Sequence, residues 1–123
     1  MIYIASRVKH APKWRKYRAS SGAAIISSWI YEAEEGQTSD LSELWARIRD
    51  EISLSSVLVF YAEADDFPLK GALVEVGIAM ALRIPIRVVT PGVCLDKNCR
   101  PVGSWMRHKS VQVFSTVEEA FIG

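Results

Sequence analysis

The sequence predicts an α/β fold in which helices cover both faces of a mostly parallel, five-stranded sheet. Apolar runs alternate with helical patterns along the 123 residues, an order that implies right-handed crossovers between parallel strands. The run at 57–61 is continuously apolar and rich in β-branched residues, as in a central strand buried on both faces. Five strands at this length predict the doubly wound, flavodoxin-like strand order 2-1-3-4-5 in one domain spanning 1–123.

The first half of the chain supplies two strands and one helix before a long polar loop. Residues 2–5 form a short apolar run, and the helix over 11–19 opens on Ala-Pro, where proline at an early helical position costs little. Residues 24–27 read as the second strand. A polar loop is expected over 28–39.

A capping box made by Asp40 and Glu43 opens the second helix. Its apolar stripe has the i, i+3, i+4 spacing of a core-facing surface, and the pattern favours core packing for Trp45: Leu41, Leu44, Trp45, Ile48 and Ile52. A third helix is expected over 68–82, ending before Pro85.

Two more strands and one helix complete the chain. The strands are predicted over 86–90 and 111–114, with an irregular segment at 91–109 between them. The spacing of Ser115 and Glu118 predicts a second capping box, which opens the last helix.

Composition excludes several classes of protein. The formal net charge of +1 argues against a dedicated nucleic-acid surface, and no apolar run approaches the roughly 20 residues of a membrane span. The N-terminus enters a strand without a signal-peptide pattern, so we expect a cytoplasmic protein. Cys94 and Cys99 alone cannot complete a tetrahedral zinc site and are expected to be free thiols, so we expect no metal and no cofactor.

The third helix carries a single charge, Glu75, between Lys70 and Arg83. Small residues around it allow close packing on a sheet, so the carboxylate should be partly buried near the helix start. Burial raises a carboxyl pKa and the helix dipole lowers it. Glu75 is therefore either a tuned reactive carboxylate or a first-turn glutamate that complements the macrodipole.

Ligands of doubly wound folds bind outside the carboxyl ends of the strands. Here those ends lie at 6–7, 27–29, 61–66 and 90–92, and the Glu75 side chain should lean back toward the same crevice. An acidic pair after the first strand, a G-x-G-x-x-G fingerprint and a P-loop are all absent from the sequence.

Residues 2–6, 57–61 and 71–81, followed by Ile-Pro-Ile at 84–86, resemble the nucleoside 2-deoxyribosyltransferase superfamily, which includes the nucleotide N-glycosidases. The likeness covers roughly residues 2 to 90. Its most specific part is the glycine, glutamate and glycine of the third helix.

The resemblance implies a flavodoxin-like subunit that works as a homodimer or larger homo-oligomer on a nucleoside or nucleotide. Glu75 matches the glutamate that acts as the family's nucleophile and attacks the anomeric carbon of the 2-deoxyribose. Tyr3 matches the tyrosine that helps hold this glutamate in place. The second acceptor is a nucleobase in a transferase and water in a hydrolase. This is the chemistry of a retaining glycosidase.

Two positions depart from the family pattern. Leu69 stands where members commonly carry an aspartate or serine, and Ala72 where they often carry threonine or glycine. The missing acid could come from Asp65 or Asp66, or these two residues form a turn and a helix cap. A chain without the acid would be a slow enzyme, or a non-catalytic protein that binds or senses nucleotides.

The expected substrate contacts come from the strand ends and the third helix: Ser6, Arg7, Lys9, Trp29, Tyr61 and Gly71. Arg7 and Lys9 would favour a 5′-phosphate. Trp29 either stacks on a base or packs as a lid over the second strand. We also expect the segment 91–109, with Trp105 and His108, to help close the crevice of a second subunit, because a chain this small should not readily bury its tryptophans.

Overall fold

The computed structural model describes residues 1–32 and 40–122. Its sheet has four parallel strands in the order β1-β2-β3-β4: β1 (Ile2–Ala5), β2 (Val57–Tyr61), β3 (Ile86–Val89) and β4 (Val111–Phe114). β2 is buried along its whole length, as the continuous apolar run predicts. The α/β class and the parallel sheet are thus confirmed.

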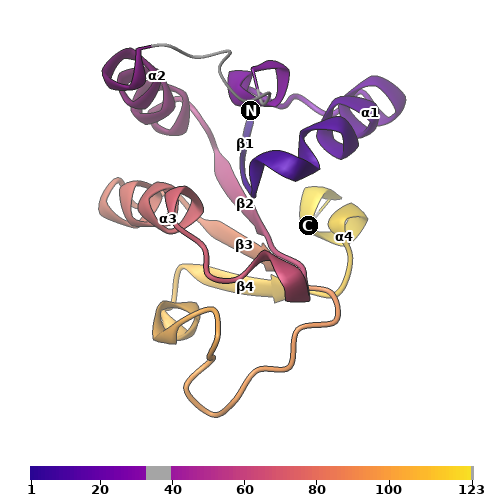
Figure 1. Ribbon diagram of the computed structural model, residues 1–123, viewed down its shortest axis with the longest axis vertical. Helices are drawn as coiled ribbons and strands as arrows, with labels where there is room; N and C mark the ends of the chain where they lie inside the picture. The colour runs from indigo at the N-terminus through magenta and orange to yellow at the C-terminus, as the bar shows by residue number, and fades with distance from the viewer. Residues whose placement is uncertain (33–39, 123) are drawn as a thin grey trace.

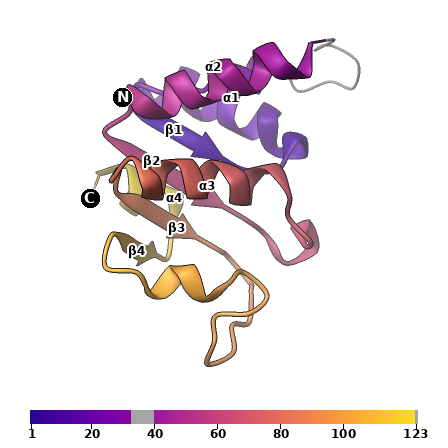
Figure 2. The ribbon, with the colours of Figure 1, turned by 90° about the vertical axis from the view of Figure 1, so that its left-hand side faces the viewer.

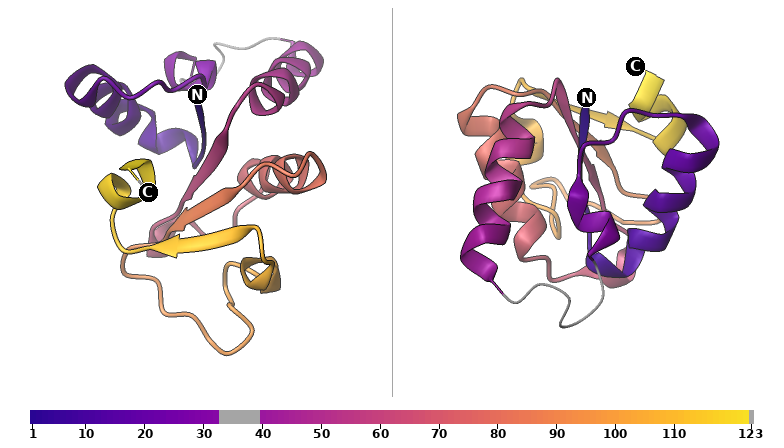
Figure 3. Two further views of the ribbon diagram at one scale, coloured as in Figure 1. Left: turned by 180° about the vertical axis from the view of Figure 1, so that it is seen from behind. Right: turned by 90° about the horizontal axis from the view of Figure 1, so that it is seen from above.

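Four α-helices form the outer layers: α1 (Ala11–Ser21), α2 (Leu41–Ser53), α3 (Gly71–Ala81) and α4 (Val117–Ile122). α2 and α3 cover one face of the sheet, and α1 and α4 cover the other (Figure 1). Figure 2 looks onto the α2–α3 face, and Figure 3 shows the same two layers from behind and from above. Short 3₁₀ helices join these elements: η1 (Val8–His10), η2 (Ser28–Tyr31), η3 (Ala64–Asp66) and η4 (Ser104–Arg107).

The predicted second strand is wrong in extent. Within 24–27 only Ile25 makes a bridge, parallel to Ile2 on the edge of β1 that β2 leaves free. Two main-chain hydrogen bonds flank this bridge, but the next amide along β1, that of Ile4, donates to the Ser27 hydroxyl at 2.6 Å. A side chain therefore replaces the backbone partner, and pairing ends there. The described residues form four strands where five were expected, so the order 2-1-3-4-5 is not confirmed.

Two helices begin at side-chain caps, as predicted, but in the last helix the capping residue is shifted by one position. Asp40 accepts the N–H of Glu43 at 3.0 Å, as expected. In the last helix Thr116, not Ser115, accepts the N–H of Glu119 at 3.2 Å. Both hydroxyl residues precede a glutamate at capping-box spacing, so the sequence offered two registers. Of the predicted loop at 28–39, η2 forms the start, and residues 33–39 lie outside the described residues.

The expectation that the chain cannot readily bury its tryptophans is wrong for Trp14 and Trp29, which are buried, while Trp105 is half-buried. Trp14 is fully buried, with ring contacts to Tyr61 and Phe121 that join α1, β2 and α4. Trp105 packs edge-on against Phe60, with ring centroids 5.2 Å apart, so η4 covers part of its own sheet. In the described residues, no helix has the length and apolar character needed to span a membrane.

Candidate active site

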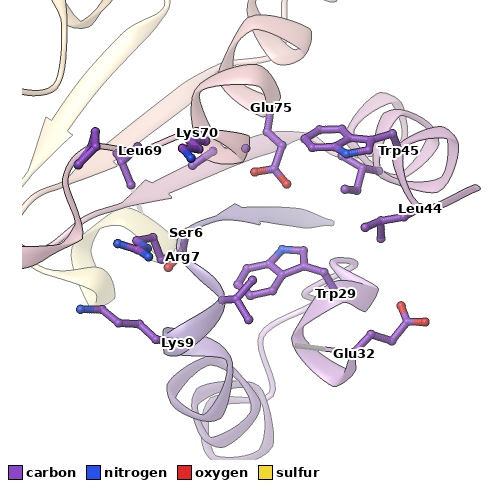
Figure 4. Close-up of a pocket in the computed structure, with 15 residues that line it drawn as sticks. Ser6, Arg7, Lys9, Trp29, Glu32, Leu44, Trp45, Leu69, Lys70 and Glu75 are labelled. Carbon is purple, nitrogen blue, oxygen red and sulfur yellow. The ribbon is translucent and has the colours of Figure 1, made fainter. Parts of the chain in front are cut away.

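A cavity of about 400 Å³ opens at the carboxyl ends of β1 and β2. Its walls come from the loop after β1, from η2, from α2 and from the start of α3 (Figure 4). Ligands were expected outside the carboxyl ends of the parallel strands, which is where this cavity lies. Of the expected substrate contacts, the structure brings Ser6, Arg7, Lys9, Trp29 and Gly71 to this cavity, together with Glu75.

Glu75 lies in the second turn of α3 with its carboxylate directed into the cavity, and only 6% of the residue is exposed (Figure 4). The fully buried Tyr3 donates its hydroxyl to Glu75 Oε1 at 2.5 Å. Burial raises the pKa of Glu75 to about 8; the Tyr3 hydrogen bond acts to lower it, and the charge of Glu51 raises it. Burial and the neighbouring Glu75 also raise the pKa of Tyr3, so Tyr3 is a neutral donor.

Two indole rings border the cavity near this carboxylate (Figure 4). Trp29 donates its Nε1–H to the carbonyl of Ile4 at 2.8 Å, which fixes the ring against β1. Trp45 comes from α2 and lies over Gly71, where an added Cβ would meet the ring at 3.6 Å. Trp29 is thus both a packed side chain and a cavity wall. The helical stripe predicted core packing for Trp45, because such a stripe does not distinguish a core from a cavity wall.

The rim of the cavity carries an ion pair that the sequence analysis did not predict. Arg47 of α2 pairs with Glu32 and donates to the hydroxyl of Ser28 at 2.7 Å. These contacts join η2 to α2, the elements that carry Trp29 and Trp45. These contacts therefore fix the position of Trp29 relative to Trp45.

Polar and cationic groups gather at the end of the cavity near β1. The Ser6 hydroxyl is buried, with 8% of the residue exposed, and has no hydrogen-bond partner among the described residues. Arg7 donates to the carbonyl of Asp66 at 3.1 Å, and Lys9 is held by Asp65 and Asp66 at 3.0 and 3.1 Å. Lys70 also borders the cavity and makes no ion pair within the described part of the chain.

The candidate acids Asp65 and Asp66 do not border this cavity. Asp66 is fully buried and accepts the N–H of Glu63 at 2.7 Å in a capping box that opens η3, and Asp65 is exposed. The turn-and-cap alternative therefore describes them. Tyr61 also lies elsewhere, because its ring packs against Trp14. The sequence could not separate these residues from the site, since Tyr61 ends β2 and the two aspartates follow it.

Leu69 and Ala72 do border the cavity, so its wall is apolar at the two positions that depart from the family pattern. Among the residues that the structure describes, no cluster of three histidine, cysteine or acidic side chains could hold a metal ion. The groups that converge on the cavity are thus one buried carboxylate with its tyrosine, two indoles, one buried hydroxyl and a few cations.

Comparison with known proteins supports the fold. The chain is similar to the structure of the 2-deoxyribosyltransferase from the psychrotolerant bacterium Bacillus psychrosaccharolyticus, with a TM-score of 0.61 and 17% sequence identity over 96% of this chain and 88% of that chain. No protein-family model and no curated protein sequence matches. The chain therefore has the fold of a 2-deoxyribosyltransferase, which confirms the resemblance at the level of the fold.

Proposed function

We propose that this protein cleaves the N-glycosidic bond of a nucleoside or nucleoside monophosphate, as a nucleoside 2-deoxyribosyltransferase or a nucleotide N-glycosidase, with Glu75 as nucleophile. The observation that carries the proposal is the buried Glu75 carboxylate, hydrogen-bonded by Tyr3, in a cavity with two indole walls. Indole rings suit the flat face of a base. The similar fold of a 2-deoxyribosyltransferase supports the same chemistry.

The reaction proceeds by two displacements at the anomeric carbon. A carboxylate oxygen of Glu75 bonds to C1′ while the C1′–N bond breaks, and its electron pair leaves with the base, which gains a proton. A second base or water then attacks C1′ and releases Glu75. Tyr3 donates to one carboxylate oxygen and leaves the other for the attack. Glu75 must be ionised to react, so its raised pKa makes the first step dependent on pH.

Protonation of the leaving base is the weak step of this mechanism. Leu69 offers no proton, and Glu32 is the only other carboxyl group among the described residues that border the cavity. Because Arg47 pairs with Glu32 and stabilises its ionised form, we assign the proton to water. Without a positioned acid among the described residues, the rate falls by a factor of about 10²–10⁴, so we expect slow turnover.

The β1 end of the cavity fits a 5′-phosphate. Arg7 and Lys70 supply cationic donors, and Ser6 supplies a buried hydroxyl without a partner among the described residues. The first residues of α3 also border the cavity, and a helix N-terminus favours an anion. Lys9 contributes less, because two aspartates already neutralise it. A phosphorylated substrate favours the nucleotide N-glycosidase over the transferase.

The outer face of α3 supports a homo-oligomer, most simply a C₂ dimer. Its exposed residues are all apolar and uncharged: Leu73, Val74, Gly77 and Ala81, with the exposed Leu82 directly after the helix. An apolar helix face of this kind usually marks an interface, and an uncharged face meets its symmetry copy without repulsion. We retain the segment 91–109 as a second candidate contact.

Incubation with a panel of nucleosides and nucleoside monophosphates, followed by chromatography of the free base, tests the activity. We expect base release by the wild-type protein and none by Glu75→Ala. The apolar wall at Leu69 favours a second candidate, a nucleotide-binding protein without catalysis. Calorimetric binding of a monophosphate without any base release would identify that alternative.

A further inference from the structure

The loop that follows β1 is fastened to the loop that follows β2 by one buried carboxylate. Asp66 is fully buried, and its Oδ2 lies 2.8 Å from His10 Nε2 and 2.7 Å from the amide nitrogen of Glu63. Its Oδ1 lies 3.1 Å from Lys9 Nζ, and its carbonyl accepts a hydrogen bond from Arg7 at 3.1 Å. Three side chains of one short segment therefore converge on a residue more than 50 positions away in sequence.

The negative charge of Asp66 is balanced by the donors around it, so Asp66 is not suited to act as an acid. Burial acts to raise the pKa of Asp66, but hydrogen bonds from the Glu63 amide, His10 and Lys9 outweigh it and lower the pKa. Asp66 is thus held as a carboxylate among donors, outside the cavity that contains Glu75. A group in this state cannot give a proton to a leaving base, but it can fix the donors around it.

The position of Arg7 depends on this contact. Arg7 borders the cavity at the end where we place the substrate phosphate, and its only hydrogen bond within the described residues is to the Asp66 carbonyl. Ser6 is its direct neighbour in sequence, so the same fastening locates the Ser6 hydroxyl. Without the contacts to Asp66, the loop after β1 would let Ser6 and Arg7 move away from the cavity. Binding would then have to order both side chains, and this loss of conformational freedom would lower the affinity for the ligand.

We propose that Asp66, with His10, is a positioning residue that holds Ser6 and Arg7 at the cavity and so sets the affinity for the phosphate group of the substrate. The inference rests on the proposed function for the identity of the substrate. It assigns Asp66 no contact with that substrate. A substitution of Asp66 should therefore change the affinity for a ligand that carries a phosphate, and not the affinity for one that lacks it.

The test compares Asp66→Asn with Asp50→Asn, the same change at an exposed position on α2 whose one ion pair among the described residues is with Arg49. Asparagine keeps the shape and can still accept the Glu63 amide, but it loses the charge that faces Lys9 and His10. We expect Asp66→Asn to raise KM for a nucleoside monophosphate about tenfold, as the loss of one charge-assisted contact implies, with little change in kcat. KM for the unphosphorylated nucleoside should stay within twofold, and Asp50→Asn should change neither value.

Calorimetry in the Glu75→Gln background separates this inference from the proposed function, because it measures binding without turnover. A tenfold loss of monophosphate affinity in Asp66→Asn, with nucleoside affinity unchanged, supports the inference even if no base release occurs. An equal loss for both ligands, or no loss, overturns it. If Asp66→Asn does not fold, His10→Gln removes the ring nitrogen contact from the other side of the pair, and the same phosphate-dependent loss is expected; its absence overturns the inference.

Discussion

Replacing Glu75 with glutamine should stabilise the protein at alkaline pH while abolishing its activity. A carboxyl group with an ordinary pKa of 4.5 that titrates at about 8 in the folded state costs about 5 kcal/mol of folding free energy once ionised. The folded state keeps a proton that the unfolded state releases between these pH values, so the free energy of unfolding falls as pH rises. Glutamine has the same shape, remains neutral and can still accept the Tyr3 hydroxyl.

Urea unfolding, followed by the fluorescence of the buried tryptophans, measures the effect. The stability advantage of Glu75→Gln over the wild-type protein should grow by about 4 kcal/mol between pH 5 and pH 8.5. Glu118→Gln, the same change at an exposed position on α4, should show no such dependence. A difference that stays constant with pH, or a Glu75→Gln protein that is less stable at pH 8.5, would refute the reasoning.

Three further predictions follow from the cavity and the outer face of α3. The value of kcat/KM should rise with pH and level off above about 8, because only the ionised Glu75 reacts; a profile that is flat from pH 6 to 9 would contradict this. Arg7→Gln should weaken binding of a monophosphate about tenfold in calorimetry, and equal affinity of the wild-type protein for a monophosphate and its nucleoside would rule out the phosphate site. Light scattering during gel filtration should give at least twice the chain mass of 13.7 kDa, with Val74→Lys reducing the mass toward that value; a fully active wild-type monomer at micromolar concentration would exclude a shared site.

The parallel sheet and the place of the site could be predicted because both depend on local patterns. The uninterrupted apolar run of β2 indicates a strand buried on both faces, and a lone carboxylate in an apolar helix indicates burial near the helix start. Because the strands are parallel, the helix that follows β2 begins at their carboxyl ends, which places Glu75 there. The contact between Glu75 and Tyr3 came from the family resemblance, since no local pattern relates positions 72 residues apart.

The errors, and the alternatives that the sequence left open, arose where a tertiary contact decides between local patterns. Residues 24–27 have the composition of a strand, but the Ser27 hydroxyl takes the Ile4 amide and ends the pairing. Asp66 follows a strand as a catalytic acid would, yet Lys9 and His10 hold it away from the cavity. Trp45 has helical core spacing, and only the neighbouring Gly71 and the shape of the cavity show it to be a wall.

The most direct test of the central claim is a search for a covalent sugar on Glu75. The wild-type protein is mixed with a substrate from which it releases base, quenched within the first turnover and digested, and the peptide that contains Glu75 is examined by mass spectrometry. We expect a mass increase of one sugar, or sugar phosphate, on Glu75, and none in Glu75→Gln, which also releases no base. Undiminished base release by Glu75→Gln, or a sugar attached to a different residue, would contradict it.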